Sequence, residues 1–244
     1  MAYALRLVRF GNWILSAIAA ILVIALLSFG GYELWYDWSV AQGAFLSDDL
    51  MQYKPAASED GSNPTLEELM AINEDVVGWL TVDDTNIDYP VVQGENDMEY
   101  VNKDVYGDFA LSGAIFLSCL NSSDFSDPYN LVYGHHMANG AMFGDLENFS
   151  DADYFSEHQT GTLYLLDRTV EITFFCCLIT DAYDDMIFQV ATDDGNAERL
   201  EYLAHNATQY RDIGLQVGDQ LIALSTCLDT NTNGRLILIG KMAD

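Results

Sequence analysis

The stretch LSTCLDTNTNGRLILIG, residues 224–240, consists of two apolar runs joined by a polar, glycine-containing connection. Apolar, β-rich runs on both sides of such a connection predict a β-hairpin. Cys227 closes the first run and Arg235 opens the second, with the connection 228–234 between them. In an antiparallel hairpin the two residues would be cross-strand neighbours, about 5 Å apart at their Cβ atoms. The sequence therefore predicts a thiol facing a guanidinium at one end of a hairpin.

A thiol and a guanidinium at a strand-to-loop junction favour a chemical role over a place in the core. A partly exposed cysteine reacts as its thiolate, which a neighbouring positive charge favours. A guanidinium can also donate hydrogen bonds to an oxygen that gains negative charge during acyl transfer. Two structural alternatives stay open, with Cys227 as one more buried cysteine and Arg235 as a strand-end residue paired with Asp229.

Two adjacent histidines, His135 and His136, follow the strand-like run NLVYG (130–134). Successive side chains of an extended chain point in opposite directions, so one imidazole can face the mouth of a barrel while the other points away. Taken alone, the two histidines could equally be solvated turn residues. A cysteine, a histidine and an arginine at three strand ends indicate a thiol acyltransferase. In such an enzyme the cysteine attacks a carbonyl, the histidine protonates the leaving amine and the arginine stabilises the oxyanion.

Two other classes of function compete with acyl transfer. A papain-like peptidase or hydrolase would use the same nucleophile, and it would release a free cleaved peptide with no amine-dependent product. A barrel that binds its ligand without turnover would form no covalent adduct between Cys227 and a warhead that mimics the substrate. The presence of Cys227, His135 and Arg235 in one chain favours catalysis over binding alone.

The pattern after residue 75 is that of short strands separated by glycine, aspartate and asparagine, which predicts a closed barrel or a sandwich. The predicted strands are 76–82, 87–93, 113–120, 130–136, 161–167, 170–180, 219–227 and 235–243. Apolar residues at helical spacing predict a helix within 193–210, and Pro64 opens a short helix that ends near Ile72. The chain after the polar linker SEDGSNP (58–64) is long enough for one domain.

The composition is globular, with 50% apolar residues and a formal net charge of −29. This acidic excess argues against binding of nucleic acid, because phosphate contacts need a basic face. Four cysteines are present without a CxxC pair or zinc spacing. Cys176 and Cys177 lie in the apolar run 170–180 and are predicted to be small core residues, although an even count of exported cysteines also permits disulfides.

The N-terminal region carries an uncharged apolar run, NWILSAIAAILVIALLSFGG (12–31), about long enough to cross a bilayer as a helix. Arg6 and Arg9 precede the run, and every acidic residue follows it, beginning at Glu33. The positive-inside rule then predicts a cytoplasmic N-terminus and an extracytoplasmic remainder. A cleaved signal peptide and a buried core helix are the alternatives, but the run is long for the apolar part of a signal peptide.

Four stretches resemble the class B sortases: YPVVQGENDMEYVN (89–102), GAIFL (113–117), LVYGHHMANGAMFGDLENF (131–149) and LSTC with its downstream arginine (224–235). The order YGHHM, MFG and then LSTC before an arginine is far more specific than a lone cysteine or histidine. The resemblance implies a mainly β fold, namely an eight-stranded sortase-type β-barrel with short helices. One of these helices, within 193–210, lies between the sixth and seventh strands, and a transmembrane helix precedes the barrel.

The resemblance also implies an enzyme on the outer face of a Gram-positive cell membrane. Together with the apolar run 12–31 and the charges around it, this gives an expected organisation in four parts. These parts are a cytoplasmic N-terminus (1–11), a single transmembrane signal-anchor (12–31), an extracytoplasmic stalk or linker (32–63) and a catalytic domain (64–244).

By the same resemblance, Cys227 is the nucleophile, Arg235 stabilises the oxyanion, and His135 is the acid/base because it directly follows the Tyr-Gly pair. The implied substrate-binding residues are Asp97, Tyr133, Ser225 and Thr226. Asp97 takes the place of an asparagine that helps to hold the substrate in relatives. Ser118 stands where an aspartate is common, which leaves Cys119 as an unusual thiol near the barrel.

The implied reaction is transpeptidation on a surface protein or pilin with a C-terminal sorting signal. Cys227 attacks a Thr-Gly or Thr-Asn-like bond, and an amine of a peptidoglycan precursor or of a pilin lysine resolves the thioester. The reaction is expected to need no cofactor and no metal, so the many acidic side chains are interpreted as a solvated surface.

Overall fold

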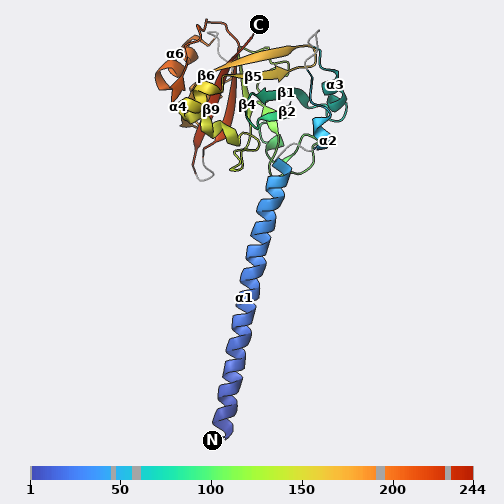
Figure 1. Cartoon of the computed structure of the whole chain (residues 1–244), viewed down its shortest axis with the longest axis vertical. Coiled ribbons are helices and arrows are strands. Elements are labelled where there is room, and N and C mark those ends of the chain that lie inside the picture. The colour runs from blue at the N-terminus through green and yellow to red at the C-terminus, as the bar shows by residue number, and fades with distance from the viewer. Residues whose placement is uncertain (1, 45–47, 57–61, 191–195, 229–231, 244) are drawn as a thin grey trace. The chain divides into compact units, whose positions relative to one another are not determined.

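The computed structural model describes residues 2–44, 48–56, 62–190, 196–228 and 232–243. It consists of two compact units, 1–42 and 43–244 (Figure 1). The first unit is formed by helix α1 (Ala2–Ala44). Its segment Arg9–Tyr36 has 28 residues and is apolar and long enough to cross a membrane. At about 1.5 Å per residue this segment exceeds the roughly 30 Å of a hydrocarbon core. The helix thus continues well beyond the predicted span 12–31.

The second unit is built on short strands, as the sequence predicts. They are β1 (Val76–Val82), β2 (Asp88–Val92), β3 (Ile115–Leu117), β4 (Tyr129–Tyr133), β5 (Thr160–Tyr164), β6 (Thr169–Asp181), β7 (Gln209–Tyr210), β8 (Leu221–Cys227) and β9 (Gly234–Met242). Eight of them match the predicted segments. The ninth, β7, has two residues and lies at the end of the segment predicted as a helix.

The strand order is β5-β1-β2-β3-β4-β8-β9-β6, and β5 also pairs with β6, so these eight strands close into a barrel. This confirms the predicted eight-stranded barrel. β7 pairs with Cys176 and Cys177 of β6 and is not one of the strands that close the barrel. Two neighbouring pairs are parallel, β2 with β3 and β4 with β8, whereas the other pairs in the ring are antiparallel.

Strand β8 is buried on both faces, which explains why LIALS lacks the alternation of a surface strand. Ile222 and Leu224 face the largest core cluster, whereas Leu221 and Ala223 face a second cluster that includes residues of helix α6. Burial on both sides holds the strand rigidly, so the residues at its carboxyl end are well placed to form a site.

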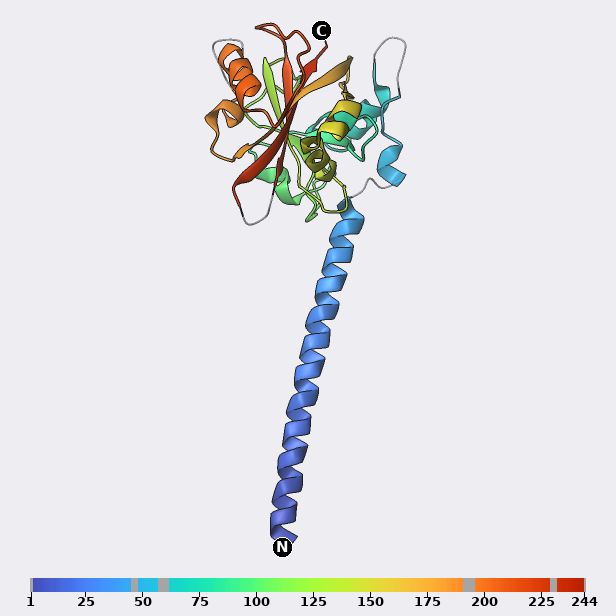
Figure 2. The same cartoon turned by 60° about the vertical axis from the view of Figure 1, so that its left-hand side comes forward.

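Short helices cover the barrel (Figures 1 and 2). They are α2 (Asp48–Met51), α3 (Pro64–Met70), η1 (Glu99–Asn102), η2 (Gly144–Ser150), α4 (Ala152–Glu157), α5 (Asp185–Phe188) and α6 (Ala197–Asn206). Helix α6 packs against β6 and is shorter than the predicted 193–210, of which 193–195 lie outside the described residues. As predicted, a helix lies between the sixth and seventh strands of the ring.

The cysteines behave as their sequence context predicts. Cys176 and Cys177 are fully buried in β6, and all four cysteines of the chain are free thiols. Cys119 and Cys227 are half-buried, so only these two present a sulfur near the surface.

Candidate functional site

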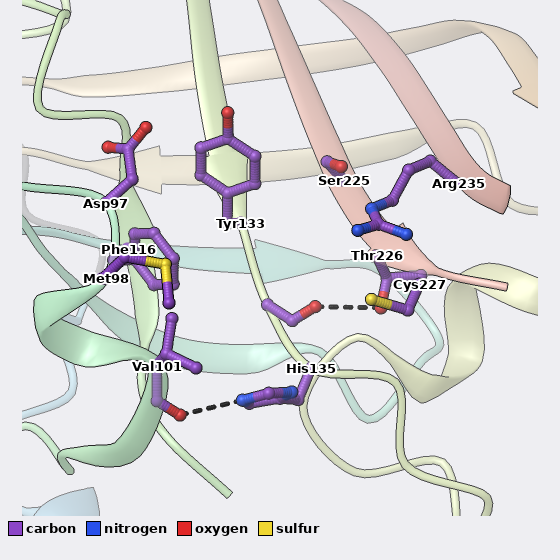
Figure 3. Close-up of a pocket in the computed structure, with 11 residues that line it drawn as sticks. Asp97, Met98, Val101, Phe116, Tyr133, His135, Ser225, Thr226, Cys227 and Arg235 are labelled. Atoms are coloured by element: carbon purple, nitrogen blue, oxygen red, sulfur yellow. Dashed lines mark hydrogen bonds between the residues drawn. The ribbon is translucent and has the colours of Figure 1, made fainter. Parts of the chain in front are cut away.

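The hairpin of β8 and β9 places Cys227 directly opposite Arg235, which confirms the predicted pairing. Below the pair, the Leu228 N–H donates to the Gly234 carbonyl at 3.0 Å and closes the strand end. Both side chains are half-buried. The Arg235 guanidinium spends one Nη1–H on the Gly234 carbonyl at 3.1 Å, and it lies on the same side of the strands as the Cys227 thiol (Figure 3).

The parallel pairing of β4 with β8 brings the histidine loop to the same strand end, although His135 lies 92 residues before Cys227. Tyr133 pairs with Ser225, and the Gly134 N–H then donates to the Ser225 carbonyl at 3.1 Å. The Thr226 hydroxyl donates to the Gly134 carbonyl at 2.9 Å. The chain therefore leaves β4 at Tyr133, two residues before His135 and beside the strand that carries Cys227.

Glycine at position 134 lies tightly against neighbouring side chains. A Cβ atom there would lie 2.5 Å from the Ile115 Cδ1 and 2.6 Å from the Phe143 Cδ2. Contacts below about 3.0 Å essentially never occur for real Cβ atoms, so the Ile115 and Phe143 side chains or the histidine loop would have to shift to admit a side chain here. The Tyr-Gly step used to choose between the two histidines thus has a steric cause.

The two adjacent histidines have different surroundings. The His135 Nε2 lies 2.8 Å from the Val101 carbonyl oxygen. The His136 Nε2 lies 3.6 Å from the Glu147 carboxylate, which is largely exposed. Only His135 lines the pocket described next, in agreement with the prediction that the two rings face different sides.

A pocket of about 340 Å³ joins these elements (Figure 3). Its lining contains all seven residues predicted for the site: Asp97, Tyr133, His135, Ser225, Thr226, Cys227 and Arg235. It also contains Met98, Val101, Phe116 and Gly134, which were not predicted. All four lie within the stretches quoted for the family resemblance, Met98 and Val101 in 89–102, but no role was assigned to them from the sequence. The volume lies at the lower end of the range for small-molecule and peptide side-chain pockets.

Tyr133 forms an apolar wall of this pocket. Its ring lies 5.2 Å from that of Phe116 and is nearly parallel to that of Phe188 at 6.5 Å. Burial raises the pKa of Tyr133 above its usual range, and the Asp97 carboxylate adds to this effect, so the hydroxyl stays neutral. Ser225 and Thr226 are almost fully buried and contribute a narrow floor between Tyr133 and Cys227.

The opposite end of the pocket carries Asp97. Its carboxylate accepts the Cys119 N–H at 2.7 Å and the Ser118 hydroxyl at 3.2 Å. These contacts hold the carboxylate at the pocket wall while part of its hydrogen-bonding capacity remains. Among the described residues, no group of three or more His, Cys, Asp or Glu side chains is arranged to hold a metal ion.

No family model matches the chain. The chain is 31% identical over 183 residues to sortase B of Listeria monocytogenes, covering 72% of this chain and 73% of that protein. It is 24% identical to sortase B of Staphylococcus aureus over 98% of both chains. Among solved structures, a class B sortase of Streptococcus pyogenes involved in pilus biogenesis is 41% identical, with a TM-score of 0.66 over 72% of this chain and 97% of that chain. Sortase B of Clostridium perfringens is 28% identical, with a TM-score of 0.68 over 73% of this chain and 99% of that chain.

Proposed function

The chain belongs to the class B sortases, which are cysteine transpeptidases, and we propose that its transfer reaction takes place on Cys227, His135 and Arg235. As a sortase it acts on proteins that carry a sorting signal. One observation carries the assignment of residues. Three side chains from separate strand ends, a thiol, an imidazole and a guanidinium, line one pocket of about 340 Å³.

In the first half-reaction the Cys227 thiolate attacks the carbonyl carbon of the scissile peptide bond. A C–S bond forms and the C–N bond breaks, while imidazolium His135 gives a proton to the departing amine. A thioester between the signal and Cys227 remains. In the second half-reaction an acceptor amine loses a proton to His135 and attacks the thioester, and the thiolate leaves.

Arg235 stabilises the oxygen that becomes negative in both halves. The guanidinium is a planar fork with five N–H donors, of which one is used on the Gly234 carbonyl. Within the described residues the other donors have no partner, and they lie on the side of the pocket next to Cys227 (Figure 3). Asp229, the alternative partner considered from the sequence, lies outside the described residues. Hydrogen bonds aimed at the developing charge lower the barrier without requiring reorganisation during the reaction.

The sorting signal occupies the rest of the pocket. We assign its contacts to Asp97, Tyr133, Ser225 and Thr226. The aromatic wall at Tyr133 suits an apolar or proline side chain, and the Asp97 carboxylate suits a backbone N–H or a positively charged group. Ser225 and Thr226 shape the floor next to the thiol, with the Thr226 hydroxyl already donated to Gly134.

The acceptor is an amine of a peptidoglycan precursor or of a pilin lysine. The Streptococcus pyogenes relative involved in pilus biogenesis supports inclusion of the pilin amine. A peptide library with C-terminal sorting motifs should be incubated with the protein, with each amine added separately. Mass spectrometry should detect an acyl adduct on Cys227 and a product that contains the amine. A free cleaved peptide at all amine concentrations would instead indicate a hydrolase.

The N-terminal helix anchors the enzyme with residues 1–11 in the cytoplasm, 12–31 in the membrane, a stalk over 32–63 and the catalytic domain 64–244 outside. Arg6 and Arg9 support this orientation through the positive-inside rule. Protease added to intact protoplasts should digest the domain and leave a small membrane fragment. Full protection of the domain would reverse the orientation.

A further inference from the structure

The imidazole of His135 has a fixed partner on the side away from the nucleophile. Its Nε2 lies 2.8 Å from the carbonyl oxygen of Val101 in helix η1. A carbonyl oxygen accepts hydrogen bonds and cannot donate them, so this bond requires a proton on Nε2. In the neutral ring the proton on Nε2 leaves Nδ1 as the basic nitrogen.

We propose that Val101 is a positioning residue whose backbone carbonyl holds His135 in the Nε2-protonated tautomer. Nδ1 then exchanges the proton of the reaction. Gly113 keeps the Val101 carbonyl in place. The inference rests on the proposed role of His135 as the acid/base. The carbonyl takes the part that a carboxylate takes in many nucleophile–histidine pairs, where the third group fixes the tautomer and orientation of the ring.

The ring lies between two sets of groups (Figure 3). The Val101 carbonyl is on one side, and Cys227 and Arg235 are on the other. Nε2 is directed at Val101, and the second ring nitrogen, Nδ1, lies at the end of the ring away from Val101, on the side of Cys227 (Figure 3). Proton transfer through Nε2 would require the ring to break its bond to Val101.

The backbone of His135 is held independently of the ring. The Thr226 hydroxyl donates to the Gly134 carbonyl at 2.9 Å, and the Phe143 N–H donates to the His135 carbonyl at 3.0 Å. These bonds fix the backbone of His135 but do not determine the orientation of its imidazole ring. Among the described residues the ring's hydrogen bond is to Val101, so this bond selects the rotation as well as the tautomer.

The Val101 carbonyl is itself held by the segment 110–114. The Ala114 N–H donates to the Tyr100 carbonyl at 3.1 Å, and the Ala110 N–H donates to the Asn102 carbonyl at 3.1 Å. These two bonds bracket Val101 and fix the direction of η1. The carbonyl between them is left to accept from His135.

Gly113 closes against this carbonyl. Its φ of +61° lies in the left-handed region, and a Cβ atom would lie 2.5 Å from the Val101 oxygen and 2.8 Å from the Tyr100 oxygen. Both atoms belong to the backbone, so a methyl group could be accommodated only if η1 and the segment 110–114 moved apart. The nearest of the clashing atoms is the oxygen that His135 uses.

The proton balance is consistent with this arrangement. When His135 is an imidazolium, both nitrogens carry protons, and the Nε2–H bond to Val101 becomes charge-assisted and stronger. The Nδ1 proton passes to the leaving amine as the C–N bond breaks, and Nδ1 later accepts a proton from the attacking amine. The second proton stays on Nε2, hydrogen-bonded to the Val101 carbonyl throughout, so the ring does not rotate between the two half-reactions.

The first test is spectroscopic. The full-length protein, labelled with ¹⁵N-histidine and held in detergent micelles, should be examined by long-range ¹H–¹⁵N correlation, with His135 assigned from a His135→Gln spectrum. We expect the correlation pattern of the Nε2–H tautomer for the neutral His135 ring. A predominant Nδ1–H tautomer, or an even mixture of the two, would overturn the inference.

The second test compares Gly113→Ala with Gly107→Ala. Gly107 also has a left-handed φ, +82°, but an added Cβ would meet nothing within 4 Å, so this control carries the same backbone strain without touching Val101. Gly113→Ala should lower kcat by at least about tenfold, toward the roughly 10²-fold loss that a 1 Å misplacement can cause. Its His135 should also lose the single Nε2–H pattern. Gly107→Ala should keep both properties.

The outcomes separate this inference from the proposed function. Equal activity and equal spectra for the two alanine variants would refute the role of Gly113. If Gly113→Ala does not fold, the wild-type tautomer still decides the role of Val101. A fully active His135→Ala enzyme would remove the proposed acid/base, whatever the tautomer. If His135→Ala is inactive but the wild-type His135 ring has the Nδ1–H tautomer, only the positioning role is refuted.

Discussion

Each end of the pocket lies beside one half-buried thiol, Cys227 at one end and Cys119 at the other. The charged side chains next to these two thiols have opposite signs. At one end Cys227 faces the Arg235 guanidinium across the hairpin. At the other end Asp97 accepts the N–H of Cys119 at 2.7 Å. Burial raises the pKa of the Cys119 thiol, and the Asp97 carboxylate raises it further. Exposure alone therefore does not identify the nucleophile of this chain, because the neighbouring charge differs in sign.

The largest effect should come from removal of the nucleophile. Cys227→Ala should lower transpeptidation by about 10⁶-fold, as loss of a nucleophile does in a serine protease. Amine-dependent product measured by mass spectrometry gives the rate. Cys119→Ala is the matched control at the acidic end and should keep most of the activity. A large loss of activity in Cys119→Ala would contradict the assignment of Cys227 as the thiol that carries the reaction.

The next largest effect should separate the adjacent histidines. His135→Ala should lower kcat by about 10²–10⁴-fold, the usual contribution of general acid–base catalysis. His136→Ala should cost much less, because that ring contacts an exposed Glu147 carboxylate and does not line the pocket. Steady-state kinetics on one signal peptide measures both variants, and equal losses would contradict the assignment.

A smaller effect should distinguish direction from charge at Arg235. Arg235→Lys keeps the positive charge but lacks the planar fork, so it should lose about 10²–10³-fold in turnover, as on removal of one oxyanion donor. Alkylation of Cys227 by iodoacetamide should stay near the wild-type rate in this variant. If lysine restores turnover while Arg235→Ala slows alkylation at neutral pH, the guanidinium acts mainly through its charge on the thiolate.

The smallest effect should appear at the acidic end. Asp97→Asn removes the carboxylate that raises the pKa of Cys119, so the pH at which Cys119 becomes alkylated should move downward. Burial, the larger cause, remains in the variant, and the midpoint should therefore stay above the value of an ordinary cysteine thiol. Mass-spectrometric labelling of Cys119 from pH 7 to 11 measures the shift. An unchanged midpoint would leave burial as the whole cause.

The local parts of the site could be predicted from the sequence. The Cys227–Arg235 pairing follows from one hairpin within 224–240, and the strands follow from apolar runs between turn residues. The approach of His135 could not be predicted in this way. It depends on parallel pairing of β4 with β8, and no local pattern specifies which distant strands pair. The resemblance to a family supplied what the residues alone did not.

The sequence pattern could not predict the roles of backbone groups or the bounds of the shortest strands. The Val101 carbonyl contacts His135 through the turn of η1, and no side chain marks that role. Strand β3 ends at Leu117 instead of residue 120, because the next two residues turn toward the Asp97 carboxylate. The two residues of β7 pair with β6 and have too little length for a periodic signal.

The parallel pairing of β4 with β8 also governs when the enzyme acquires its activity during folding. Pairing of strands far apart in sequence is slow, since the ordering of the intervening chain must precede the contacts that stabilise it. Ribosomes complete β4 long before β8, which ends at Cys227, and β9, which begins one residue before Arg235. A partly folded chain consequently holds its thiol apart from its imidazole and cannot cleave neighbouring proteins. Recovery of transpeptidation after dilution from denaturant would then time the joining of these strands, while circular dichroism would follow the secondary structure as a whole.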